Sequence, residues 1–272
     1  MIFFSSPGKL ALHCEEDPDW ILFGVPYDST CCANTGARFG PNAVREASCQ
    51  LEVFDCDLEL DLTDIRVRDI GNINGSFGDP RITHKIIRKA VSELEHPFIA
   101  LGGEHTIAYP LVSVSRPEVA VVLDAHLDLR EEFLGESLSH ACTSRRLLEI
   151  CDVAVYGYRE CSQEEFLFLR EKSIPAYQPS HLEHASYPEG KKVHISFDMD
   201  VLDPCIAPNV SNPVPNGISF DTALSVVEKV ISRNTITSMD ICEVCSRYAD
   251  TTAVTAAHIL YKMLALWRKT HV

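Results

Sequence analysis

The sequence predicts an α/β fold in which a mostly parallel β-sheet is covered by helices on both faces. Two observations lead to this prediction. Short runs of apolar residues recur along the chain, and segments with helical apolar spacing lie between them. Strands that alternate with helices form parallel sheets, because each helix crosses back over the sheet to the start of the next strand. No linker, repeat or low-complexity stretch interrupts the chain, so we expect one domain over residues 1–272.

The predicted strands are rich in Val, Ile, Phe and Leu and hardly alternate between apolar and polar residues. Such nearly continuous apolar runs are typical of strands that are buried on both faces. Each run ends in a polar or glycine-rich turn. The runs are Trp20–Val25, Pro97–Leu101, Val119–Leu123, Val153–Tyr156, Val193–Phe197 and Ile236–Ile241.

Three helices are expected from their capping residues and their apolar periodicity. Asp79 and Pro80 are typical of an N-cap and a first helical residue, and apolar residues follow at helical spacing as far as Leu94. Ser219 and Asp250 are the expected N-caps of two further helices with the same kind of spacing. In sheets of this kind the functional groups lie in loops beyond the carboxyl ends of the strands.

The composition excludes disordered and collagen-like classes, because 46% of the residues are hydrophobic and 23% are charged. The net charge of −15 argues against nucleic acid and acidic membrane surfaces as partners and is compatible with a cationic substrate. Solubility alone explains this charge equally well. The eleven cysteines are scattered, and no signal peptide or membrane-length apolar run is recognised. We therefore expect a soluble, cytoplasmic protein with reduced thiols.

Acidic residues and histidines follow the predicted strands directly. One strand runs into Asp124, His126 and Asp128, which alternate and therefore point to one side of an extended segment. Asp198 and Asp200 repeat this arrangement after a second strand. An isolated cluster of either kind is often only a loop with a capping aspartate. Several clusters at the carboxyl ends of buried strands favour a metal centre instead.

The four aspartates of these clusters carry about four negative charges, and burying them without cations is prohibitively costly. Two divalent ions would balance them. His105, which ends a third strand in the sequence Gly-Gly-Glu-His, and His126 would give each ion one nitrogen ligand. Oxygen-rich sites that include imidazole favour Mn²⁺ over Zn²⁺.

These motifs resemble those of the arginase/agmatinase superfamily of ureohydrolases, most of all its archaeal agmatinases. The resemblance covers about residues 20 to 265, and segments 24–28, 36–41, 207–208 and 243–244 agree with the family pattern. Its three signatures correspond to Gly-Gly-Glu-His, Asp-Ala-His-Leu-Asp and Ser-Phe-Asp-Met-Asp-Val-Leu-Asp-Pro at residues 102–105, 124–128 and 196–204.

The resemblance implies a single ureohydrolase domain with the three-layer α/β/α arginase-like fold. It also implies two Mn²⁺ ions per subunit and a homo-oligomer, either a trimer or a hexamer. Carried over residue by residue, it implies that the metal ligands are His105, Asp124, His126, Asp128, Asp198 and Asp200.

The implied reaction is attack on a guanidinium carbon by a hydroxide formed from a water that two metals share. Asp128 is expected to orient this hydroxide as well as to bind metal. His140 resembles the family histidine that shuttles protons, and Glu243 resembles the glutamate that pairs with the substrate guanidinium. The structural alternatives are a hydrogen-bonded loop histidine for His140 and a helix cap for Glu243.

The sequence therefore predicts a hydrolase that releases urea from a small cationic guanidino compound. Agmatine is favoured, with putrescine as product and polyamine biosynthesis as pathway, because segment 128–141 resembles agmatinases. Arginases place an Asn before the shuttle histidine and two alternating aspartates after Arg159, and this chain has neither. Arginase or another guanidino-acid ureohydrolase is the alternative. Candidate partners for the second amine of agmatine are Glu131, Glu132, Glu136 and Glu160.

Other functional classes fit less well. An amide hydrolase of the histone-deacetylase type uses one zinc and paired histidines, and no His-His pair occurs here. A metal phosphatase needs basic groups, which are few near these motifs. A catalytically inactive homologue usually loses metal ligands, whereas all six are present. Glu104 replaces the usual Asp beside His105, and loop 207–213 departs from the family pattern, so the pocket walls differ from those of relatives.

Overall fold

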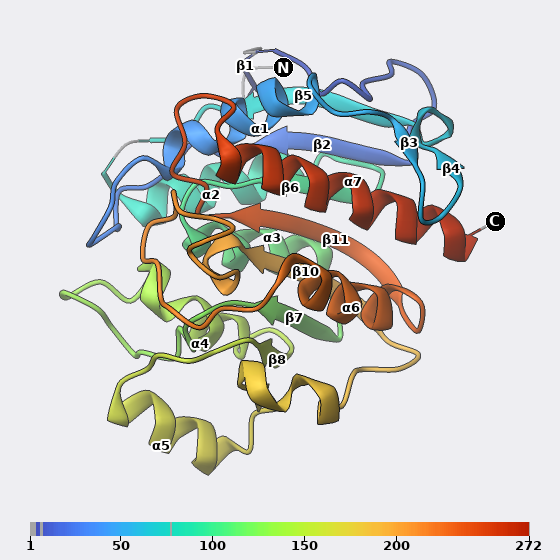
Figure 1. The fold of residues 1–272 in the computed structure, drawn as a ribbon. Coiled ribbons are helices and arrows are strands. Elements are labelled where there is room, and N and C mark those ends of the chain that lie inside the picture. The colour runs from blue at the N-terminus through green and yellow to red at the C-terminus, as the bar shows by residue number, and fades with distance from the viewer. Residues whose placement is uncertain (1–3, 6–7, 77, 272) are drawn as a thin grey trace.

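The computed structural model describes residues 4–5, 8–76 and 78–271, with a nine-stranded sheet at its centre (Figure 1). The strand order is β1-β5-β2-β6-β11-β10-β7-β8-β9, and neighbouring strands are parallel except β1 and β5. A separate ribbon is formed by β3 (Phe54–Asp55) and β4 (Leu60–Asp61). The strands of the main sheet are β1 (Phe4–Ser5), β2 (Trp20–Gly24), β5 (Val67–Ile73), β6 (Phe98–Leu101), β7 (Val119–Leu123), β8 (Asp152–Tyr156), β9 (Ala176–Tyr177), β10 (Lys192–Asp198) and β11 (Thr235–Cys242).

Helices cover both faces of this sheet, which gives the three-layer α/β/α arrangement that the sequence predicts (Figure 1). One face is covered by α1 (Gly40–Ser48), α6 (Phe220–Ile231) and α7 (Thr251–His271). The opposite face is covered by α2 (Pro80–Val91), α3 (Ala108–Ser115), α4 (Thr143–Leu147) and α5 (Gln163–Lys172).

Successive side chains of the central strands enter opposite layers of the core. In β2, Trp20 and Leu22 join the apolar cluster beneath α1 and α7, whereas Ile21 and Phe23 join the cluster beneath α2 and α3. Strand β7 alternates in the same way between two clusters. This burial on both faces explains why the strands read as continuous apolar runs in the sequence.

The six predicted strands and three predicted helices are confirmed. Asp79 caps α2 by accepting a 2.8 Å hydrogen bond from the amide of Arg81, and Ser219 caps α6 in the same manner. Helix α2 ends at Val91, earlier than the expected Leu94. The elements that were not predicted from the sequence are β5, α1, α3, α4 and α5, as well as the two-residue strands.

The order of the strands brings four carboxyl ends together at one edge of the sheet. Strands β6, β11, β10 and β7 lie next to one another in this order in the sheet. In the sequence, β10 and β11 are separated from β6 and β7 by a long stretch of chain. The loops that leave these four ends carry the acidic residues and histidines that the sequence predicts to be functional. The hydrogen-bonded sheet therefore holds the candidate site together.

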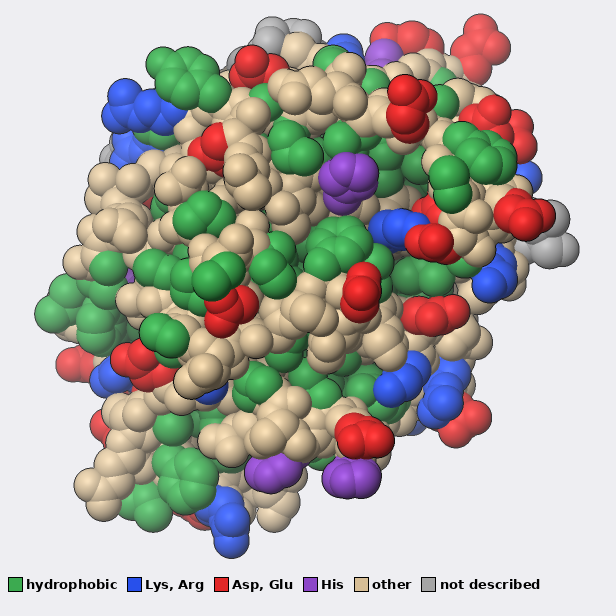
Figure 2. Space-filling view, viewed as in Figure 1, with side chains coloured by type: hydrophobic (Ala, Val, Ile, Leu, Met, Phe, Trp, Pro, Cys, Tyr) green, Lys and Arg blue, Asp and Glu red, His purple; other side chains and the backbone are tan. Residues whose placement is uncertain are grey.

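The surface carries charges of both signs (Figure 2), and the cysteine thiols form no disulfide bonds within the part of the chain that the structure describes. Acidic and basic side chains are interspersed over the face that α6 and α7 cover (Figure 2). All eleven cysteines are free. Among the described residues, no helix combines the length and the apolar composition that crossing a membrane requires.

A buried ion pair fixes α1 to β5, near the amino-terminal part of the sheet. The guanidinium of Arg45 contacts Asp69 at 2.7 Å through Nε and at 2.9 Å through Nη2, and it also donates to Asn72. Both charged side chains are almost fully buried. Removing one partner of such a pair leaves an uncompensated charge in the core.

We therefore predict that Asp69→Ala lowers the free energy of unfolding by about 3–5 kcal/mol, measured by urea denaturation followed by circular dichroism. Glu171→Ala is the matched control, because Glu171 forms an exposed pair with Lys172. The control should cost less than about 1 kcal/mol. Equal losses in the two variants would contradict the stabilising role of the Arg45–Asp69 pair.

Candidate metal centre and active site

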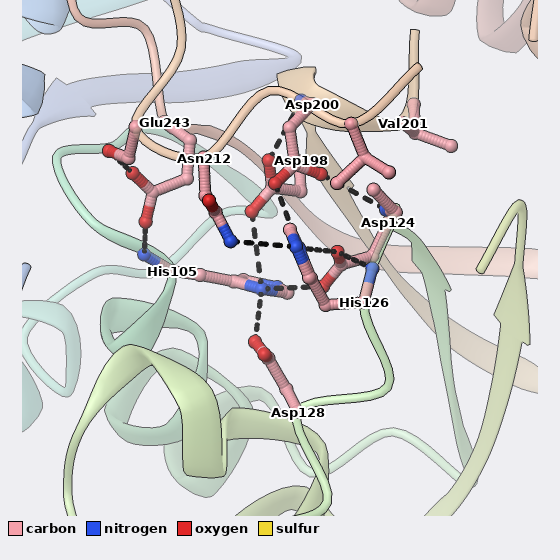
Figure 3. Close-up of polar contacts among 12 residues, drawn as sticks. His105, Asp124, His126, Asp128, Asp198, Asp200, Val201, Asn212 and Glu243 are labelled. Carbon is pink, nitrogen blue, oxygen red and sulfur yellow. Dashed lines mark hydrogen bonds and ion pairs between the residues drawn. The ribbon is translucent and has the colours of Figure 1, made fainter. Parts of the chain in front are cut away.

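Six acidic and histidine side chains converge where β6, β7 and β10 end (Figure 3). His105 begins the short 3₁₀ turn after β6, and Asp124, His126 and Asp128 lie in the extended segment after β7. Asp198 is the last residue of β10, and Asp200 lies in the 3₁₀ turn that follows. All are buried except His126, which is partly exposed.

The first group of potential ligands surrounds Nδ1 of His105. This nitrogen lies 3.0 Å from Oδ2 of Asp128, 3.1 Å from Oδ2 of Asp124 and 3.4 Å from Oδ2 of Asp198. His105, Asp124 and Asp128 present their ligand atoms within 4.8 Å of one another. One nitrogen thus faces three carboxylate oxygens.

The second group surrounds Nδ1 of His126. This nitrogen lies 3.0 Å from Oδ2 of Asp200 and 3.4 Å from Oδ1 of Asp124. The three residues again present their ligand atoms within 4.8 Å. Asp124 belongs to both groups, with one carboxylate oxygen directed to each histidine. A pair of adjacent cation sites that share a bridging carboxylate fits this arrangement.

The hydrogen bonds behind His105 show that its donor set suits a metal ion. Ser196 donates its hydroxyl proton to Asp240 at 2.8 Å, so its oxygen accepts from Nε2 of His105 at 3.0 Å. In the neutral imidazole, Nδ1 then has only a lone pair to direct at the carboxylates. Oδ2 of Asp124 has no hydrogen-bond partner among the described residues. A divalent cation between these acceptors would remove the repulsion between them.

The ionisation of these groups supports the same conclusion. Burial, and next the charge of Asp124, raise the pKa of Asp128 to about 7. Burial, and next the charge of Asp200, raise the pKa of Asp198 well above its usual value. The surrounding aspartates outweigh burial and raise the pKa of His105 and of His126. The carboxylates thus attract more positive charge than two histidines supply, as expected for a centre that binds divalent cations.

Glu243 follows β11 and lies beside the first ligand group (Figure 3). One oxygen of its carboxylate accepts a 2.7 Å hydrogen bond from the amide of His105, and the other accepts from the hydroxyl of Ser211. Burial raises the pKa of Glu243 to about 8, although the bond from Ser211 opposes the shift. A cation placed next to this carboxylate would restore its charge.

A cavity of about 190 Å³ opens above the ligand groups. Seven of the eight predicted site residues line it, and Asp124 lies beneath them. His140 lies on its wall, where burial, and next the charge of His105, lower the pKa of the imidazole to about 4. His140 is therefore neutral near pH 7 and can accept a proton. The cavity is also lined by Arg130, Phe133, Glu160 and Cys161.

Two residues that support the site, Ser211 and Asn212, were not given a role from the sequence. The side-chain nitrogen Nδ2 of Asn212 lies 2.9 Å from Nε2 of His126 (Figure 3). The other ring nitrogen, Nδ1, faces Asp124 and Asp200. Asn212 and Ser211 belong to loop 207–213, whose departure from the family pattern was the available signal. Arg159 donates to the carbonyl oxygens of Asp200 and Val214 at 2.8 and 2.7 Å, and so holds the ligand loops.

We predict that Asp124→Asn abolishes binding at both cation sites, because one carboxylate serves both groups. After manganese loading and gel filtration, elemental analysis should give two ions per wild-type chain and less than one for the variant. Asp152→Asn, which alters an exposed aspartate at the opposite end of β8, should keep both ions. Two ions retained by Asp124→Asn would contradict the shared carboxylate.

Comparisons with known proteins agree with the site. The N(1)-aminopropylagmatine ureohydrolase of Thermococcus kodakarensis is 34% identical over 93% of this chain and 92% of the relative. The agmatinase of Pyrococcus horikoshii is 32% identical over 92% and 93%. The agmatine ureohydrolase structure of Thermoplasma volcanium superposes with a TM-score of 0.83 at 26% identity, over 93% of this chain and 91% of that chain. The model of the Arginase family matches residues 18–265, and the chain belongs to this family.

Proposed function

We propose that this protein is a binuclear manganese ureohydrolase that releases urea from agmatine and leaves putrescine. The observation that supports this most strongly is the pair of ligand groups sharing Asp124, directly beneath a cavity lined by Glu243 and His140. Relatives named agmatinase, at 31–33% identity over more than nine-tenths of the chain, support the choice of substrate.

In this proposal His105 and Asp128 would hold one Mn²⁺ ion and His126 and Asp200 would hold the other, and Asp124 and Asp198 would contribute to both sites. Their oxygen-rich donor sets with one imidazole each suit Mn²⁺. The chemistry that two such ions supply is Lewis-acid polarisation and the activation of water near neutral pH. Asp128 additionally orients the nucleophile by accepting a hydrogen bond.

Glu243 is proposed to bind the substrate guanidinium. The cavity is acidic, and two divalent ions would neutralise the four aspartates, which leaves Glu243 as a buried carboxylate without a compensating cation. Its oxygens already accept from the amide of His105 and from Ser211, so the carboxylate is fixed in position before substrate arrives. A planar cation with several N–H donors matches such an acceptor.

His140 is proposed to carry the proton that the leaving amine needs. Because its imidazole is neutral in the free site, it can take up a proton released when water is activated. It can then deliver that proton to the nitrogen of the departing amine. Its position in the lining of the same cavity as Glu243 supports this role.

Among the four glutamates considered for the second amine of agmatine, Glu160 fits best. Glu131 is paired with Arg145 and Arg146, and Glu136 is paired with Arg81. Glu132 does not line the cavity, whereas Glu160 does. No ion pair of the Glu160 carboxylate occurs within the described residues. Glu160 therefore has an acceptor available for a distal ammonium group.

We further propose that the chain acts as one ureohydrolase domain over residues 1–272 within a cytoplasmic homo-oligomer, either a trimer or a hexamer. The family match over residues 18–265 supports the first part of this proposal. The family resemblance supports the rest.

The proposed activity predicts urea release by the manganese-loaded protein with agmatine. N1-aminopropylagmatine, arginine and 4-guanidinobutyrate are assayed in parallel. Urea from agmatine at the highest kcat/KM would support the proposal. Preferential cleavage of N1-aminopropylagmatine, the substrate in the name of one relative, or of a guanidino acid would contradict agmatine as substrate. No urea from any of the four, with two metals bound, would contradict the reaction itself.

The role of Glu160 predicts that Glu160→Gln raises KM for agmatine about two- to fivefold, as expected for the loss of one exposed ion pair. The value of kcat should stay within about twofold, because the distal amine is remote from the reacting carbon. Glu132→Gln is the control and should leave both constants unchanged. An unaltered KM in Glu160→Gln would show that another group binds the distal amine.

A further inference from the structure

A hydrogen-bonded chain connects Glu104, which the proposed mechanism does not use, to the cavity histidine His140. Glu104 is fully buried beside the ligand loop. Its Oε2 accepts a 2.8 Å bond from the amide of Thr30, and its Oε1 accepts a 2.7 Å bond from the hydroxyl of Thr30. Thr30 lies 74 residues away in sequence, in the loop that follows β2. Both donors of Thr30 are thus directed at one carboxylate.

The same hydroxyl oxygen contacts His140 twice. It accepts a 3.0 Å bond from the backbone amide of His140 and lies 3.3 Å from Nδ1 of the imidazole. A threonine hydroxyl has one proton and two lone pairs. Since the proton is donated to Glu104, only a lone pair remains for Nδ1. An unprotonated Nδ1 would face that lone pair and be repelled, so Nδ1 carries a hydrogen.

The other nitrogen, Nε2, then carries the basic lone pair. Cys32 lies 3.6 Å from Nε2 through its Sγ, and both residues line the cavity. Nε2 is therefore the nitrogen on the cavity side of the ring. Phe133 packs edge-on against the imidazole, with ring centroids 5.9 Å apart, and restricts its rotation.

We propose that Thr30 is a positioning residue that fixes the tautomer of His140, so that Nε2 exchanges protons with substrate while Thr30 holds Nδ1–H. Glu104 aligns Thr30 by accepting both of its hydrogen bonds. This inference rests on the proposed role of His140 as the proton carrier. Thr30 itself contacts neither metal ligands nor the reacting atoms.

Ser139 provides a matched control for this proposal. Its hydroxyl also lies 3.3 Å from Nδ1 of His140, yet no other hydrogen bond fixes its proton among the described contacts. The Ser139 hydroxyl can therefore adapt to either tautomer. Thr30, with its proton donated to Glu104, cannot.

The test is a double-mutant cycle on the manganese-loaded protein with agmatine. Thr30→Val, which replaces the hydroxyl by a methyl group, should lower kcat by about tenfold or more, with KM within about twofold. Thr30→Ser should restore kcat to at least about half of the wild-type value, and Ser139→Ala should change it by less than about twofold. In a His140→Asn background, adding Thr30→Val should have almost no further effect, because Thr30 acts through His140.

Three results would overturn the inference. One is a normal kcat for Thr30→Val beside a low kcat for His140→Asn, and this outcome leaves the proposed function intact. Another is an equal loss on adding Thr30→Val with and without His140. The third is a loss of manganese or of thermal stability in Thr30→Val that matches its loss of kcat, since Thr30 would then only support the ligand loop. Equal kcat values for wild type and His140→Asn would contradict the proposed role of His140, on which the inference rests, and would leave the proposed reaction intact.

Discussion

The rest of the site depends on the mutual repulsion of four buried aspartates whose carboxylates face the same space. Their repulsion and burial are costly, and the raised pKa of Asp128 and Asp198 expresses that cost. The parallel sheet holds them there because β7 and β10 are hydrogen-bonded neighbours along their length. His105 directs a nitrogen lone pair into the same space, and Nδ1 of His126 also faces two of the carboxylates. Divalent cations bound among these carboxylates would offset that cost.

The hydrogen bonds around this centre fix the orientation and the tautomer of two histidine side chains. Asp240 and Ser196 determine which nitrogen of His105 faces the carboxylates. Glu104 and Thr30 stand in the same relation to His140 on the cavity wall. In both cases a buried carboxylate accepts a hydroxyl proton, and the hydroxyl oxygen then accepts from an imidazole. The same series of carboxylate, hydroxyl and imidazole thus fixes which nitrogen of His105 and of His140 accepts and which donates.

The parts predictable from sequence are those that local patterns determine. The central strands are recognisable because both faces are buried, and the ligands in 124–128 and 198–200 follow because alternate residues of an extended segment share a side. Strand β5 was missed because it contains Arg68 and Asp69, and the burial of Asp69 depends on Arg45 from a different element. Thr30, Ser211 and Asn212 reach the site through loop paths that no local pattern reveals. The roles of His140 and Glu243 came from the family resemblance.

Anomalous X-ray diffraction from crystals of the manganese-loaded protein, recorded near the manganese absorption edge, tests the central claim most directly. The account predicts two peaks about 3.5–4 Å apart. One should lie among His105, Asp124 and Asp128 and the other among Asp124, His126 and Asp200. A single peak, or peaks at other residues, would contradict a binuclear centre built on a shared Asp124.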